Sequence, residues 1–198
     1  MASSLNTNKK IKLTKHQKIP IEYLKKHRAL IIYHSTGTGK TVTALLAVYQ
    51  FKNDIVIIGP KNSQKTFIDH IQILKLDISR FTFYSFKKVK KILESDVKLF
   101  RNKSVIIDEA HNLRTENLHN LYITSALSMA FRIILLTATP VINSLNDLAV
   151  LVNIVKNDQV LPTDRDLLHQ MYYDPEKMTV INEDNLVKKL NDSPENTN

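Results

Sequence analysis

The feature that most restricts the fold of this chain is the string HSTGTGKT at residues 34–41, which lies between two apolar runs of different character. Residues 29–33 read ALIIY and favour a strand, whereas residues 42–51 favour a helix. Glycine lets backbone amides approach a polyphosphate closely, and the N-terminus of a following helix adds a partial positive charge. The strand, loop and helix order therefore predicts a phosphate-binding loop.

Each position of the loop has an expected role. Lys40 would reach the β- and γ-phosphates, and the Thr41 hydroxyl would ligate Mg²⁺. The strict pattern has glycine where this chain has His34, so a glycine-containing turn is the alternative interpretation. The predicted nucleotide-binding residues are Ser35, Thr36, Gly37, Thr38, Gly39, Lys40 and Thr41.

A second string, DEAH at residues 108–111, follows the apolar run 104–107. Carboxylates at the C-terminal end of a buried strand lie where open α/β sheets bind their ligands. We expect Asp108 to hold Mg²⁺, directly or through water, and Glu109 to polarise the attacking water. A helix N-terminus that favours acidic residues is the alternative. Because the string occurs together with the phosphate-binding loop, it favours a site that hydrolyses a nucleotide with Mg²⁺.

Length and composition predict one compact domain with a core of its own. The chain has no cysteine, which excludes a disulfide framework and a thiolate metal site. Its seven histidines show no metal-ligand spacing. No apolar run approaches the length of a membrane-spanning helix, and the N-terminus lacks the apolar segment of a signal peptide. We therefore expect an intracellular protein without a membrane partner.

Positive charge is concentrated in one half of the chain. Residues 1–103 contain 21 lysines and arginines against 6 acidic residues, whereas residues 104–198 contain 7 against 13. The basic half is the candidate nucleic-acid face, and binding of that kind weakens steeply with salt. A solvated helix face or a basic tail is the alternative. One lysine cluster comprises Lys9, Lys10, Lys12, Lys15 and Lys18, and the other comprises Lys87, Lys88, Lys90 and Lys91.

Short apolar runs alternate with helical patterns along the chain. Strands are expected at 29–33, 55–58, 81–84, 105–107 and 133–136, and helices at 42–51, 63–74, 87–93 and 117–129. Strands separated by crossover helices predict an α/β fold with a mostly parallel, doubly wound sheet and helices on both faces. The expected organisation is a basic flexible N-terminus (1–12), an ATP-binding domain (13–156), a helical extension (157–190) and a disordered tail (191–198).

These strings resemble, in the right order, the motifs of superfamily 2 helicases and translocases, whose first RecA-like domain is a P-loop NTPase fold. The resemblance covers about residues 13–155. It implies that Gln17, in LTKHQ, recognises adenine. Residues 135–155 look like motif III, in which Thr137 and Thr139 would link the γ-phosphate state to domain movement, with His111 also in the coupling.

Two further segments resemble motifs that lie on the nucleic-acid side in this family. Residues 55–71 look like motif Ia, and residues 81–92 look like motif Ib. The resemblance implies backbone-directed contacts to nucleic acid, DNA rather than RNA, with little sequence preference. The residues expected to make them are Lys61, Lys87, Lys88, Lys90 and Lys91.

Within the superfamily, the chain is similar to the Swi/Snf-like branch, and most of all to the nucleoside triphosphatase I and early transcription factor ATPases of large DNA viruses. His34 before STGTGKT and the LPTDRDLL continuation carry this likeness. Ala138 departs from the commoner Swi/Snf form, which has glycine there. The likeness implies a role in viral transcription, and a location in the virion or the host cytoplasm.

The resemblance also implies a missing part. Relatives bind ATP between two RecA-like domains, and the second supplies an arginine finger that is typically worth about 10³ to 10⁵ in rate. The chain is therefore expected to need a second domain or a partner in the transcription machinery for full turnover. The leading hypothesis is the ATP-binding domain of a translocase whose ATP hydrolysis is stimulated by nucleic acid.

Two other functions are consistent with some of these residues. A non-catalytic, nucleotide-gated binding module that acts through a partner fits the missing arginine finger, although Glu109 favours an enzyme. A small-molecule kinase fits the phosphate-binding loop, but DEAH together with TATP at residues 137–140 disfavours it.

Overall fold

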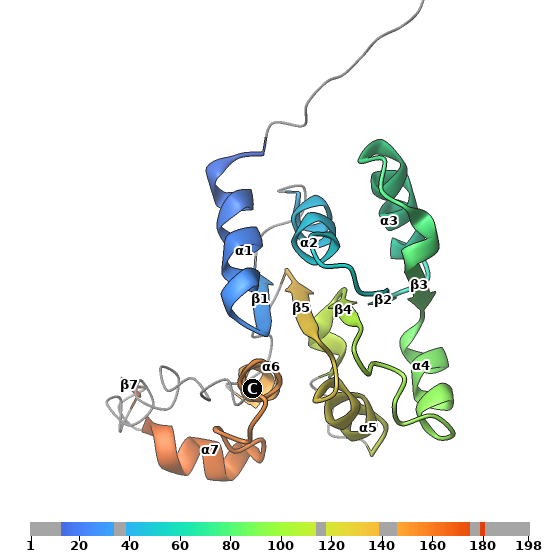
Figure 1. Cartoon of the computed structure of the whole chain (residues 1–198). Coiled ribbons are helices and arrows are strands. Elements are labelled where there is room, and N and C mark those ends of the chain that lie inside the picture. Colours follow the sequence, from blue (N-terminus) through green and yellow to red (C-terminus); the bar gives the residue numbers. More distant parts are fainter. Residues whose placement is uncertain (1–12, 34–38, 114–117, 139–145, 175–178, 181–198) are drawn as a thin grey trace, which may run out of the picture.

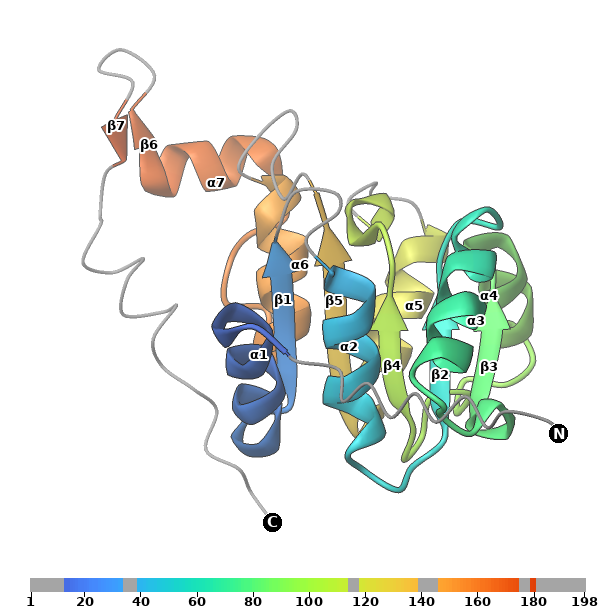
Figure 2. The same ribbon diagram turned by 90° about the horizontal axis from the view of Figure 1, so that it is seen from above.

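A five-stranded parallel sheet forms the centre of the chain in the computed structural model (Figures 1 and 2). The structure describes residues 13–33, 39–113, 118–138, 146–174 and 179–180. The strands are β1 (Ala29–Tyr33), β2 (Ile55–Ile58), β3 (Phe81–Tyr84), β4 (Ser104–Ile107) and β5 (Arg132–Thr137). They follow the order β1-β5-β4-β2-β3, and every neighbouring pair is parallel. The predicted α/β class with a parallel sheet is confirmed.

Helices cover both faces of the sheet, as predicted. One face carries α1 (Lys15–Lys26), α2 (Lys40–Tyr49) and α3 (Ser63–Ile73), and the other carries α4 (Phe86–Leu93), α5 (Leu118–Leu127) and α6 (Asn146–Lys156). Figure 1 looks along the sheet and shows the two helical layers on either side of it.

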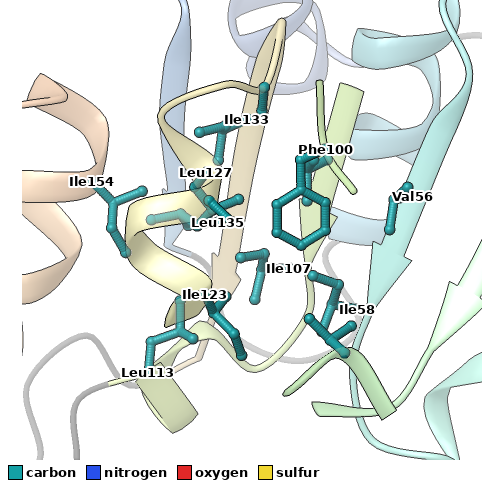
Figure 3. Packing of buried hydrophobic residues seen from close by; sticks show 14 of the residues in the cluster. Val56, Ile58, Phe100, Ile107, Leu113, Ile123, Leu127, Ile133, Leu135 and Ile154 are labelled. Carbon is teal, nitrogen blue, oxygen red and sulfur yellow. The ribbon is translucent and has the colours of Figure 1, made fainter. Parts of the chain in front are cut away.

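Side chains along each strand point alternately to the two faces of the sheet, so the hydrophobic core has two parts, one under each helical layer. In β2, Ile55 and Ile57 face α1, α2 and α3, whereas Val56 and Ile58 face the opposite layer. Successive strand residues point to opposite faces, so a strand that is apolar throughout is buried on both. Figure 3 shows the second layer, where Phe100 packs among side chains from β2, β4 and β5.

Helix α1 is an element that the sequence did not predict. It begins with a capping box, in which the Thr14 backbone N–H donates to Gln17 Oε1 at 3.0 Å. Pro20 lies inside the helix, where its missing N–H and its ring disfavour helical structure. Burial of Leu24 against α2 stabilises the helix in spite of the proline.

A short extension follows α6. Asp164 Oδ1 accepts from the Leu167 backbone N–H at 2.8 Å and caps α7 (Arg165–Tyr172). Residues 157–190 were expected to be helical, and the structure also shows two short antiparallel strands there, β6 (Tyr173–Asp174) and β7 (Thr179–Val180). Residues 175–178 and 181–190 of the expected helical extension lie outside the described residues.

Among the described helices, none is both long enough and apolar enough to cross a bilayer.

Candidate nucleotide-binding site

The candidate site lies at the C-terminal edge of the sheet, where β5 separates β1 from β4 (Figure 2). Lys40 is the first residue of α2, and Asp108 directly follows β4. Burial raises the pKa of the Asp108 carboxyl group overall, and the Lys40 ammonium lies close enough to oppose that rise. The strand order thus brings together a cation and a carboxylate that are 68 positions apart in the chain.

Part of the predicted site lies outside the described residues. This applies to His34, which precedes the loop, to the loop residues Ser35, Thr36, Gly37 and Thr38, and to Thr139 beyond β5. Their predicted roles stay predictions. The remaining candidates for the nucleotide site lie in described segments, whereas Lys9, Lys10 and Lys12 of the first lysine cluster lie outside them.

Gly39 has a conformation and surroundings that explain why glycine occurs there. Its φ of 83° is left-handed, and a Cβ at this position would lie 2.5 Å from Gln17 Nε2. The Gln17 amide therefore packs directly on the end of the phosphate-binding loop. This contact places Gln17 beside the predicted nucleotide site, and adenine recognition by Gln17 remains a prediction.

The first turn of α2 follows directly from Gly39. The Gly39 carbonyl accepts from the Thr43 backbone N–H and from Thr43 Oγ1, both at 3.0 Å. Lys40 and Thr41 are half-buried in this turn. An exposed helix N-terminus attracts anions through its free amides and its dipole, so both side chains begin where phosphate would be held.

Asp108 is held rigidly at the end of β4. Its backbone N–H donates to the Ile58 carbonyl at 2.7 Å, which extends the ladder between β4 and β2 by one residue. Burial raises the pKa of the Asp108 carboxyl above its ordinary value. A hydrogen bond from Ser63 opposes this rise, the Glu109 carboxylate adds to it, and the Lys40 charge opposes it.

The donor set fits Mg²⁺ bound together with phosphate. Mg²⁺ is usually held by one or two carboxylates and by substrate phosphates, with water completing the shell. Asp108 supplies a partly buried carboxylate, and Thr41 supplies a hydroxyl. Among the described residues, no three or more histidine, aspartate or glutamate side chains form a group that could hold a metal ion. Mg²⁺ at this site would therefore need phosphate and water as further ligands.

Gly59 is a site residue that the sequence analysis missed. It follows β2, and a Cβ there would lie 3.0 Å from both Asp108 Cβ and Ser63 Oγ. Its φ is not left-handed, so the constraint is space rather than backbone conformation. The chain has three glycines, and the position of the third directly after a buried strand was the available signal.

Glu109 has an unusual backbone conformation for its residue type. Its φ is 52°, in the left-handed region that costs a non-glycine residue on the order of 1 kcal/mol. The Glu109 carbonyl accepts from the Asn112 backbone N–H at 2.9 Å and from Asn112 Nδ2 at 2.8 Å. These bonds hold the turn into the short 3₁₀ helix η2 (Ala110–Leu113).

His111 connects Glu109 to β5. Its Nδ1 lies 3.1 Å from Glu109 Oε2 and 3.4 Å from Thr137 Oγ1. The shorter contact fits an Nδ1–H that donates to the carboxylate, because an ionised carboxylate can only accept. Thr137 is buried at the end of β5. The structure thus brings together the three residues Glu109, His111 and Thr137.

Two of the predicted nucleic-acid lysines, Lys61 and Lys88, lie at a pocket at the neighbouring end of β2 and β3. Lys61 lines it, and Lys88 Nζ lies 5.3 Å from the centroid of the Tyr84 ring, which also lines it. Lys87, Lys88 and Lys91 are exposed on α4, whereas Lys90 is half-buried. We call this the Gly59 pocket; its lining residues are Ile57, Gly59, Pro60, Lys61, Ser63, Gln64, Phe83, Tyr84 and Ser85.

Replacement of Asp108 by Asn is expected to raise the melting temperature of the ligand-free chain at pH 7. A raised carboxyl pKa means that ionised Asp108 destabilises the fold above that pKa, and an uncharged amide removes this cost. A gain of about 1 kcal/mol corresponds to roughly 2–4 °C at this chain length. Thermal melts between acidic and neutral pH test the prediction.

The advantage of Asp108→Asn should shrink as the pH falls and be lost below the ordinary carboxyl pKa of about 3.9, because there the wild-type group is protonated in both the folded and the unfolded state. Asp69→Asn, which changes an exposed carboxylate on α3, is the matched control and should leave the melting temperature nearly unchanged. An equal effect of both variants would contradict the assigned burial cost.

Comparison with known families gives a match over most of the chain. Residues 53–193 match the model of the SNF2-related domain. The SWI2/SNF2 ATPase core of Sulfolobus solfataricus, solved in complex with double-stranded DNA, superposes with a TM-score of 0.66 over 90% of this chain and 43% of that one. The two sequences are 16% identical, so this likeness shows the fold alone.

Viral proteins are among the curated relatives. A protein of Acanthamoeba polyphaga mimivirus, named as an ATP-dependent RNA helicase, is 61% identical over 178 residues, which is 90% of this chain and 40% of the relative. The early transcription factor 70 kDa subunit of Melanoplus sanguinipes entomopoxvirus is 26% identical over 68% of this chain and 23% of its own length. The chain thus spans well under half of each relative.

Proposed function

Because the chain belongs to the SNF2-related domain family, we propose that it binds and hydrolyses ATP in a translocase whose turnover is stimulated by nucleic acid. The observation that carries the proposal is the convergence of Lys40, Asp108 and Glu109 at one edge of the sheet. A cation for phosphate, a carboxylate for Mg²⁺ and a carboxylate for water are the groups that ATP hydrolysis requires.

The residues around Glu109 suit it to act as the base toward the attacking water. The carboxylate is 38% exposed, so water can reach it, and His111 fixes its orientation through the 3.1 Å contact. Lys40 would stabilise charge on the β- and γ-phosphates, while Asp108 and Thr41 would hold Mg²⁺, which neutralises phosphate charge when bound. Glu109 would accept the proton of the water as it attacks the γ-phosphorus.

The contact between His111 and Thr137 supports a role in coupling. Thr137 ends β5, directly before the segment that contains Thr139. If a change at the γ-phosphate moves Glu109, His111 would transmit this movement to Thr137 at the end of β5. We propose that His111, Thr137 and Thr139 transmit the nucleotide state in this way.

Duplex DNA is the proposed nucleic acid. The solved neighbour is described in complex with double-stranded DNA, whereas the mimivirus relative is named for RNA. Lysines on α4 and Lys61 offer charge without base-reading geometry, which fits contact with the phosphate backbone. Competition between duplex DNA and RNA of the same sequence tests this choice, and preference for RNA would contradict it.

The salt dependence of duplex binding should report the lysines of α4. In the double variant Lys87→Ala/Lys91→Ala, we expect the slope of log K against log salt to become less steep by about 1 to 2 units, because each lost phosphate contact removes about 0.9. Lys25→Ala/Lys26→Ala changes two exposed lysines that precede β1 at the opposite edge of the sheet and serves as the control. Titrations over a range of salt concentrations measure both slopes.

If the slope of Lys87→Ala/Lys91→Ala equals that of the wild type, α4 does not contact phosphates. Equal flattening in both double variants would indicate non-specific attraction by total charge instead.

A second RecA-like domain or a subunit of the transcription machinery is the proposed partner. The early transcription factor subunits among the relatives support a place in viral transcription. The competing proposal is a nucleotide-gated binding module without useful turnover. ATP hydrolysis with and without duplex DNA separates the two, since stimulated turnover requires an enzyme and nucleotide binding without turnover indicates a module.

A further inference from the structure

The two ends of the Gln17 side-chain amide have different surroundings. Its Oε1 accepts from the Thr14 backbone N–H and from Thr14 Oγ1, both at 3.0 Å. Its Nε2 packs on Gly39, where an added Cβ would lie 2.5 Å away. Within the part of the chain that the structure describes, Nε2 donates no hydrogen bond. The amide therefore has an occupied acceptor and two available donors beside the phosphate-binding loop.

The contact with Thr14 also fixes which end of the amide is the oxygen. A backbone N–H can only donate, so the amide atom that faces it must be an acceptor. An amide oxygen has two lone pairs, and Thr14 supplies a donor for each of them. As long as this capping box of α1 is intact, Gln17 cannot accept a hydrogen bond from a ligand.

The position of α1 suits contact with the base of a nucleotide. Helix α1 packs on α2 and β1, whereas Asp108 follows β4, and β5 lies between β1 and β4 (Figure 1). Two strands that are separated by a third lie about 10 Å apart. A nucleotide whose γ-phosphate and Mg²⁺ are held at Asp108 would therefore extend its other end, the base, toward Gln17.

The available donors fit both purines equally well. Adenine presents the N7 acceptor and a 6-amino donor on one edge, so an amide needs its oxygen and its nitrogen to bind both. Guanine presents two acceptors, N7 and O6, on the same edge. An amide that can only donate binds N7 of either base. Cytosine has an amino donor on the corresponding edge, which would face Nε2 without an acceptor.

We infer that Gln17, held by Thr14, selects purine nucleotides without selecting adenine, so that the site accepts GTP as well as ATP. The inference rests on the proposed function and names the substrate class of the same site. It differs from the adenine recognition that the family resemblance implies, because the oxygen that the 6-amino group of adenine needs is already used inside α1.

The test measures the affinity of the full chain for non-hydrolysable analogues of ATP, GTP and CTP in the presence of Mg²⁺. In the wild type, both purine analogues should bind about 2- to 13-fold more tightly than the CTP analogue, which corresponds to one neutral hydrogen bond. The ATP analogue should have no advantage over the GTP analogue.

Gln17→Glu removes both donors of the amide and keeps an acceptor for Thr14, so the capping box is retained. The advantage of the ATP and GTP analogues over the CTP analogue should be lost, and the ratio to CTP cancels the effect of the added charge on phosphate. Gln72→Glu is the matched control, because it adds the same charge at an exposed position near the C-terminal end of α3. It should leave both ratios unchanged.

Thr14→Pro removes the two donors that occupy Gln17 Oε1. Proline has neither an N–H nor a hydroxyl group, and the φ of −74° at Thr14 suits its ring. The freed amide can then bind N6 and N7 of adenine together. The ATP analogue should gain about 5- to 150-fold over the GTP analogue, which is the discrimination of a bidentate base contact.

Three results would overturn the inference while the proposed function stands. They are an advantage of ATP over GTP of about fivefold or more in the wild type, a purine advantage that survives Gln17→Glu, and an unchanged ratio of ATP to GTP in folded Thr14→Pro. Thermal melts identify a variant that does not fold, and if Thr14→Pro is one, the wild type and Gln17→Glu decide. Failure of the wild type to bind any of the analogues overturns the proposed function, and the inference with it.

Discussion

Lys40→Ala is expected to reduce the affinity of the chain for ATP by about 10- to 150-fold. A charge-assisted hydrogen bond contributes about 1.5–3 kcal/mol, and each 1.4 kcal/mol is a factor of ten in affinity. Lys40 begins α2, where the helix dipole also favours phosphate, and no backbone group can replace its charge. Titration with a fluorescent ATP analogue in the presence of Mg²⁺ measures the loss.

Lys52→Ala is the appropriate control for that measurement. Lys52 is exposed just beyond the other end of α2, so its removal lowers the net charge equally without touching the site. It should leave ATP affinity within about twofold of the wild type. Unchanged affinity in Lys40→Ala would show that the strand, loop and helix unit is a structural turn, and the nucleotide-binding assignment would be withdrawn.

Glu109→Gln is expected to lower ATP turnover by about 10² to 10⁴, the usual contribution of general acid–base catalysis. The amide has the same shape, and its Oε1 can still accept from His111 Nδ1, so the orientation of the side chain is retained. Only the ability to take a proton from water is lost. ATP affinity should therefore remain close to that of the wild type, and a single-turnover assay with duplex DNA measures the chemical step.

Glu94→Gln, at the C-terminal end of α4, is the control for this variant because Glu94 is an exposed carboxylate away from the site. Its turnover should match the wild type. Equal turnover in Glu109→Gln and the wild type would mean that another group activates the water. If Glu109→Gln and the wild type bind ATP equally and neither hydrolyses it, the result would favour the nucleotide-gated module.

The strands could be predicted because their residues differ sharply from their surroundings. Residues 55–58 and 104–107 are buried on both faces and read as short uninterrupted apolar runs, and the observed strand ends differ from the predicted ones by at most one residue. Periodicity failed for α1, because Pro20 and seven charged or polar neighbours conceal Leu24, which is fully buried.

The sequence predicts which residues form the site, but it does not predict which of them are in contact. Lys40, Asp108 and Glu109 follow from motif and context, but their proximity depends on β5 lying between β1 and β4. No local pattern encodes that order. The fit of Gly59 against Asp108 depends on the register of β2 with β4, so a sequence that shows Gly59 cannot show what it contacts.

The backbone of Glu109 is a similar case. A glutamate with φ of 52° contradicts its local preference, and the bonds that hold it come from Asn112, three residues later. The preference of a single residue is overridden where neighbouring hydrogen bonds hold an unusual backbone conformation, and such conformations cluster at functional sites.

The pairing of β1 with β5 also has a consequence for the order in which the molecule can be assembled. Ala29 lies opposite Ile133 in the sheet, and β1 pairs with no other described strand. During synthesis β1 leaves the ribosome about a hundred residues before its neighbour, and long-range parallel pairing of this kind forms slowly. A nascent chain that ends between residues 108 and 131 thus contains Lys40 and Asp108 but not β5, the strand that sets the distance between them.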